Sequence, residues 1–168
     1  MAVKLKQMPE LKLLTDEEYK ILEALSKAII PAGDNPKTDP GAIETEAAVF
    51  LDEILSNGDH YFASDFKEGL LSLNKLAYQK HQKAFYLLSK EQDDLLRVFA
   101  ADDYLSFNRL RKMIFQSFYS NYTKEDYQGI SPWELIGYLG PVTYTHASAE
   151  MINRHYHKSQ TDKTFTLD

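Results

Sequence analysis

Cysteine is absent from this chain of 168 residues, which excludes disulfides, iron–sulfur ligation by the chain itself and catalysis through a thiolate. Glycine is scarce, at 7 residues, and none of them forms a G-x-G-x-x-G or P-loop pattern. The usual cradle for a dinucleotide or a nucleotide phosphate is therefore missing. No G-x-S-x-G nucleophile elbow is present either. No apolar run approaches the ~20 residues of a membrane span, and residues 1–13 lack the apolar core of a signal peptide.

The charge balance is acidic, with a net charge of −6 and a pI near 5.4. Because phosphate neutralisation needs clustered Lys and Arg, this balance argues against nucleic acid as a partner. Aromatic residues are plentiful, with 11 Tyr and 9 Phe. Tyrosine suits both a core and an amphipathic contact surface, so these residues are the first candidates for an interface.

Apolar residues recur at helical spacing through most of the chain, and no segment alternates for long with the period of a strand. We expect an all-α single domain of five or six helices with an irregular C-terminal segment. The expected helices run from Thr15 to a stop at Pro31, over 39–57, 64–81, 89–99 and 102–119, with a short capped turn at 131–137. Capping boxes are predicted at Thr15 with Glu18, at Ser89 with Gln92 and at Ser131 with Glu134. The predicted organisation is an N-terminal arm over 1–13, a helical domain over 14–158 and a flexible tail over 159–168.

A metal site is the most specific catalytic alternative. His146, Glu150, His155 and His157 lie close in sequence, and imidazole with carboxylate suits zinc in a small metal-dependent hydrolase. However, two histidines separated by one residue point to opposite sides of a strand, or about 200° apart on a helix. Solvated histidines near a chain end are the preferred interpretation.

The segment 104–119 is rich in aromatic residues. Tyr104, Phe107, Leu110, Ile114, Phe115 and Phe118 form a stripe at helical spacing that we interpret as core. Phe115, Phe118, Tyr119 and Tyr122 together carry more apolar surface than one helix face usually hides, which points to an interface. Arg109, Arg111 and Lys112 flank the stripe. They are interpreted as a solvated face, with an ionic contact to a partner subunit as the alternative.

Residues 131–141 read SPWELIGYLGP. Ser131 suits an N-cap, Pro132 the first helical position and Gly137 a stop about one turn later. Trp133, the chain's only tryptophan, lies inside this corner, and we expect it to be a buried anchor. The segment resembles the C-terminal signature of the gluconate 2-dehydrogenase subunit 3 family, G-W-[KE]-[ED]-[LI]-G-Y-P-G-P, but Leu139 replaces the usual first proline. Further stretches resemble the family in the same order, at 29–31, 39–44, 51–52, 69–73, 88–96 and 110–119, so that the likeness covers about residues 14 to 142.

The resemblance implies a non-catalytic small subunit that binds and stabilises a separate FAD-dependent sugar or polyol dehydrogenase. In bacterial assemblies of this kind the large subunit carries FAD, a cytochrome c subunit often takes the electrons, and the chaperone-like small subunit assists export through a twin-arginine signal. No cofactor is expected in this chain, and no such signal precedes its domain. We expect a periplasmic location, or association with a membrane through a partner, if the family role holds, and a cytoplasmic location if the chain is the full native one and travels alone.

The predicted partner surface combines Phe118, Tyr119 and Tyr122 with the turn from Tyr138 to Pro141. Surplus aromatic area, a rigid turn beside it and the family resemblance coincide on these two segments. A stand-alone helical scaffold and the hydrolase described above remain the alternatives.

Overall fold

The computed structural model describes residues 9–58, 60–120 and 129–137. The chain divides into two units, Met1–Ile136 and Gly137–Asp168, and the description below concerns the first. Every regular element in the described ranges is helical, which confirms the all-α prediction. The elements are α1 (Asp16–Ile29), α2 (Ala47–Asn57), α3 (His60–His81), the 3-10 turn η1 (Phe85–Leu87), α4 (Gln92–Asp102), α5 (Tyr104–Ser120) and α6 (Pro132–Leu135).

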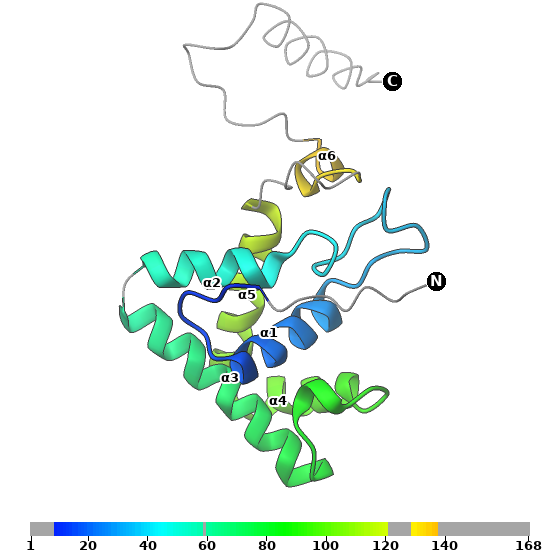
Figure 1. Ribbon diagram of the computed structural model, residues 1–168. Coiled ribbons are helices and arrows are strands. Elements are labelled where there is room, and N and C mark those ends of the chain that lie inside the picture. The colour runs from blue at the N-terminus through cyan, green and yellow to red at the C-terminus, as the bar shows by residue number, and fades with distance from the viewer. Residues whose placement is uncertain (1–8, 59, 121–128, 138–168) are drawn as a thin grey trace, which may run out of the picture. The chain divides into compact units, whose positions relative to one another are not determined.

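Helix α5 is the centre of the bundle. It contacts each of the other five α-helices in the described part of the chain, and Figure 1 shows it passing behind α1 and α2. Its buried side, Leu110 and Ile114, joins a core supplied by α1, α2, α3, η1 and α4. The largest fully buried side chains of this core are Phe66, Phe85, Ile21, Leu22, Leu25, Leu51, Leu70, Leu73 and Leu95. Gly69 of α3 lets the two helices approach, since a Cβ there would lie 3.3 Å from the Leu110 side chain.

Helix α1 begins as the sequence predicts. Thr15 is the N-cap, its hydroxyl accepts from the Glu18 amide, and the Glu18 side chain accepts from the Thr15 amide. Leu14 and Tyr19, on either side of the cap, are both buried in the core and fix the entry of the chain.

Helix α2 begins later than the predicted residue 39. Residues 41–46 make a separate turn, in which the Glu44 carboxylate accepts from the Gly41 amide at 3.0 Å. Glu46 then adopts a left-handed conformation (φ 52°), which no non-glycine residue in a continuing right-handed helix does. The prediction of one helix over 39–57 is therefore wrong at its start, and α2 has no side-chain cap.

Two smaller differences concern the middle of the chain. Helix α3 starts at His60, before the predicted residue 64. The predicted capping box at Ser89 and Gln92 is not formed, because the Glu91 carboxylate accepts from the Ser89 amide while the Gln92 side chain donates to the Phe85 carbonyl at 3.1 Å. Hydrogen bonds to the Glu91 carboxylate from its own backbone amide and from the Ser89 amide lower the pKa of Glu91.

Distant segments are tied together by three buried polar side chains. The Asp52 carboxylate accepts three backbone amides, from Lys12, Leu13 and Leu14, at 2.6, 3.1 and 2.7 Å. Asn74 of α3 accepts the Phe85 amide at 2.9 Å. The Ser117 hydroxyl of α5 donates to the Ala47 carbonyl of α2 at 2.6 Å. These directional hydrogen bonds join the arm, α2, α3, η1 and α5, and they fix how the segments align with one another, which non-directional apolar packing does not do.

Candidate protein-binding surface

The capped corner at 131–137 forms as predicted. The Ser131 hydroxyl accepts from the Glu134 amide at 3.2 Å, and the Glu134 carboxylate accepts from the Ser131 amide at 2.7 Å. Hydrogen bonding of the Glu134 carboxylate with the Ser131 backbone amide, and also with the Ser131 side chain, holds the pKa of Glu134 below its usual value. Pro132 fills the first helical position, and Gly137, at φ 67°, ends the turn in the left-handed region that favours glycine.

Trp133 fastens this corner to the end of α5. Its indole N–H donates to the backbone carbonyl of Tyr119. One residue before the cap, the Ile130 amide donates to the Lys37 carbonyl at 2.8 Å, which ties the corner to the loop after α1 as well. The ring is half-buried and belongs to neither of the two apolar clusters of the described residues, so Trp133 is an edge anchor and not the core anchor that the sequence suggested.

Exposed apolar side chains gather on the two elements that this hydrogen bond joins. Phe115 and Tyr119 are each 37% exposed, and their rings stack with centroids 6.4 Å apart and planes 10° apart. Leu135 and Ile136, in and directly after α6, are 40% and 58% exposed. We call these four residues the α5–α6 corner. Isolated exposed apolar residues are ordinary, but four on two elements that hold each other in place favour a contact surface.

The predicted interface residues fall into three groups. Phe118 is 2% exposed, packs with Ala42 and Ala47 and meets the Tyr119 ring edge-on at 5.0 Å, so its ring is occupied inside the chain. Tyr119 faces solvent. Tyr122, Tyr138 and Pro141 lie outside the described residues, as do His146, Glu150, His155 and His157 of the metal alternative.

The interpretation of the whole 104–118 stripe as core is wrong in part. Leu110, Ile114 and Phe118 are buried, whereas Tyr104 is 62% exposed and Phe115 lies in the α5–α6 corner. Tyr104 and Phe115 are separated by about three turns of α5 and lie on the same outward side. The sequence does contain a signal that Tyr104 and Phe115 share a face, because residues 11 apart return to the same side of a helix.

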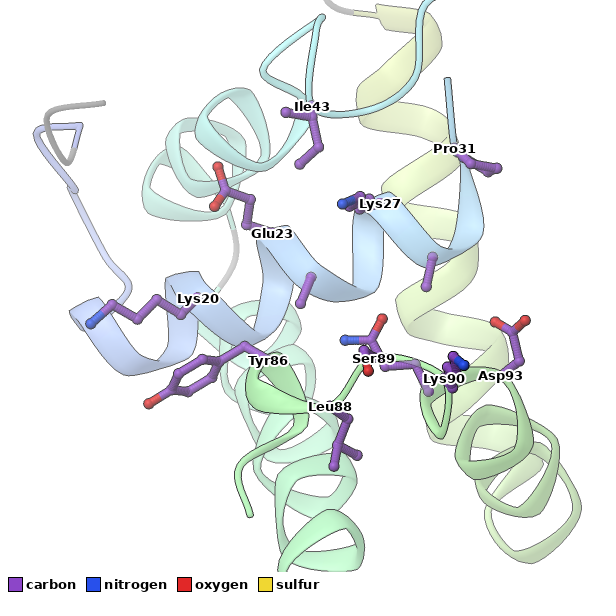
Figure 2. Close-up of a pocket in the computed structure, with 13 residues that line it drawn as sticks. Lys20, Glu23, Lys27, Pro31, Ile43, Tyr86, Leu88, Ser89, Lys90 and Asp93 are labelled. Carbon is purple, nitrogen blue, oxygen red and sulfur yellow. The ribbon is translucent and has the colours of Figure 1, made fainter. Parts of the chain in front are cut away.

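The chain also has a cleft of about 610 Å³ beside α1, bounded by η1, the start of α4 and the loop at 31–43. Figure 2 shows Lys20 and Tyr86 at one end and Pro31 and Ile43 at the other. The cleft is lined by three lysines, Lys20, Lys27 and Lys90, and by two carboxylates, Glu23 and Asp93. A second cleft of about 460 Å³ shares part of this lining. Because three lysines and two carboxylates share the rim, its net charge is small and the cleft selects weakly for ligand charge.

Within the described ranges, no group of three or more His, Asp or Glu side chains is placed to hold a metal ion. In the same ranges no helix is both long and apolar enough to cross a membrane.

Comparison with protein families matches residues 16–140 to the family described as gluconate 2-dehydrogenase subunit 3. The chain belongs to the gluconate 2-dehydrogenase subunit 3 family. The matched range contains all six α-helices of the described residues and ends just beyond α6, so both parts of the α5–α6 corner lie within the family region. The family name associates the chain with a dehydrogenase complex. Searches of curated proteins and of solved structures returned no match.

Proposed function

We infer that this chain is a non-catalytic small subunit that binds and stabilises a separate FAD-dependent sugar or polyol dehydrogenase subunit. The observation that carries the proposal is the α5–α6 corner: stacked, outward-facing Phe115 and Tyr119 beside a capped turn that Trp133 fastens to the same helix end. The family to which the chain belongs supplies the class of partner.

The geometry of the corner suits binding more than chemistry. Aromatic rings on a braced element bury a large area on association and lose little rotamer entropy, because their positions are already fixed. In this assignment FAD lies in the large subunit, a cytochrome c subunit accepts the electrons where one is present, and this chain helps the large subunit to fold and to be exported.

The first test uses the chain alone. Purified without a partner, it should show no flavin absorbance and no oxidation of sugars with an artificial electron acceptor. Both should appear when a candidate FAD-dependent dehydrogenase subunit is co-expressed and co-purified with it. Bound flavin or turnover from the lone chain would contradict the non-catalytic assignment.

The second test locates the contact. In the variant Phe115→Ala/Tyr119→Ala, the Tyr119 backbone carbonyl still accepts from Trp133, so the corner keeps its brace. We expect partner affinity to fall by about 2 kcal/mol or more, about 30-fold. The control is Leu71→Ala/Tyr78→Ala on α3, which removes an exposed apolar and an exposed aromatic side chain (52% and 47%) from a different helix. Equal recovery of the dehydrogenase with both folded variants would place the contact elsewhere.

A further inference from the structure

Helix α5 differs in charge from the rest of the described chain. It contains Arg109, Arg111 and Lys112 and no acidic residue, whereas each of the other α-helices contains at least one Asp or Glu. The chain as a whole carries a net charge of −6. The positive charge of α5 is therefore a local exception on an acidic protein.

Only one of the three cations is used inside the described structure. Arg109 pairs with Asp65 of α3 at 3.0 Å and so stabilises the contact between the two helices. Arg111 and Lys112 are both exposed, and within the described ranges neither forms an ion pair. Their charge remains available to a second molecule.

The exposed cations continue the aromatic surface. Arg111, Phe115 and Tyr119 are spaced at i, i+4 and i+8, which places them in one row along α5, each step rising about 6 Å. Lys112 lies beside Arg111 at the same end of the row. A guanidinium and an ammonium thus stand one helical turn from the stacked rings, and the side chains of Arg111, Lys112, Phe115 and Tyr119 are all exposed.

We propose that Arg111 and Lys112 bind a cluster of Asp and Glu side chains on the dehydrogenase subunit, next to the pocket that receives Phe115 and Tyr119. The inference rests on the function proposed above and adds the chemistry of the receiving surface. Arginine presents a planar fork that matches a carboxylate, and the lysine adds a second point charge. Since the remainder of this acidic chain repels an acidic surface, the row also fixes the orientation in which the two subunits meet.

An acidic protein surface accounts for the row better than an anionic lipid or a nucleic acid. Binding to phosphate polymers or headgroups depends on many cations clustered together. Here two cations stand beside two aromatic rings on a protein of net charge −6. Binding of the lone chain to phosphatidylglycerol vesicles, lost on reversal of these two charges, would assign the row to a membrane and overturn the proposal.

The deciding experiment measures association of the purified chain with the dehydrogenase subunit that co-purifies with it, at low and at high ionic strength. The test variant is Arg111→Glu/Lys112→Glu. The control is Lys75→Glu/Lys80→Glu, which changes two exposed lysines of α3 and alters the net charge by the same amount. We expect the test variant to associate about 10-fold or more slowly than the control at low ionic strength, and to lose most of the salt dependence of the wild type.

The outcomes separate the two proposals. If the wild type binds and both double variants associate at the same rate, the acidic contact is wrong while the accessory-subunit function stands. If the wild-type chain does not bind the dehydrogenase under any condition, the proposed function fails and this inference fails with it.

Discussion

Asp52 holds the segment before α1 through three backbone hydrogen bonds, and the variant Asp52→Asn tests how strongly that segment is fixed. The carboxylate is 2% exposed. One oxygen accepts from Leu13 and Leu14, and the other accepts from Lys12 at 2.6 Å. In the variant, the amide oxygen can still serve the first two donors. The amide nitrogen would face the Lys12 N–H, donor against donor.

The expected loss follows from these contacts. One charge-assisted bond disappears and leaves a part-buried donor without an acceptor, while two others become neutral bonds, which together cost about 2–4 kcal/mol. The loss of stability cannot exceed the cost of releasing the whole segment from the helical core. That cost is of similar size, because release exposes Leu14, which is 5% exposed in the fold, and the half-buried Leu13. At about 2–4 °C per kcal/mol for a chain of this size, the melting temperature should fall by about 5–15 °C.

Urea unfolding gives the free energy, and amide hydrogen exchange gives the location. The amides of residues 12–14 should exchange much faster in Asp52→Asn. The matched control is Glu53→Gln, the neighbouring carboxylate, which is exposed and forms an ion pair with Lys12 Nζ at 2.5 Å. An exposed pair contributes at most about 1 kcal/mol. Equal destabilisation by the two variants would refute the argument that burial and the three backbone donors make Asp52 the anchor.

Three further perturbations test the corner and the loop after α1. Trp133→Ala should lower the free energy of unfolding by about 2 kcal/mol, because the indole is half-buried. Removal of a fully buried ring costs about 3–5 kcal/mol. A loss of about 4 kcal/mol or more in a thermal melt would therefore place the ring in the core. The capping box at Ser131 should be fully formed above pH 4.5, the ordinary pKa of Glu134, and should be lost as the pH falls through the lower pKa that Glu134 has in the folded state. The fluorescence emission of Trp133 measures this loss. Gly41→Ala should cost about 1–3 kcal/mol in urea unfolding, because its Cβ would lie 2.4 Å from the Ala32 amide nitrogen.

The predictions for Glu134 and Gly41 each have a conservative control variant. Glu134→Gln keeps a side-chain acceptor for the Ser131 amide without a titrating group, so the acid change in emission should disappear; its persistence would assign the transition to another group. Gly58→Ala places its Cβ 3.3 Å from the Ile54 carbonyl, so its cost should stay below that of Gly41→Ala. Equal losses at the two glycines would show that backbone crowding at residue 41 is unimportant.

The sequence predicted those features that depend on neighbouring residues. The boxes at Thr15 and Ser131 form because donor and acceptor lie within one helical turn. The box at Ser89 fails because the Gln92 side chain is drawn to the Phe85 carbonyl, a partner that no local rule identifies. The left-handed Glu46 is likewise set by how residues 41–46 pack, and glutamate gives no local signal for it.

The surface was predicted less completely than the fold. Helical spacing identifies which aromatic residues of α5 share a face, but exposure depends on which helices cover that face. Phe118 is covered by Ala42 and Ala47, and Tyr119, one residue later, is not. The partner surface therefore remains a prediction, now centred on Phe115 and Tyr119 in the described ranges.

Helix α2 has a consequence for the order of folding. It is 11 residues long, its N-cap has no side-chain hydrogen bond, and its first turn has no acidic residue, so it is marginal by itself. The buried hydrogen bonds that hold α2 come from distant segments: Leu14 and Asp52 are 38 residues apart, and Ser117 and Ala47 are 70 residues apart. Loops of that length close late. We therefore expect α2 and the arm to form as one late cooperative unit on a preformed α3–α5 pair, and pulse-labelled hydrogen exchange showing early protection of Leu51 would contradict this order.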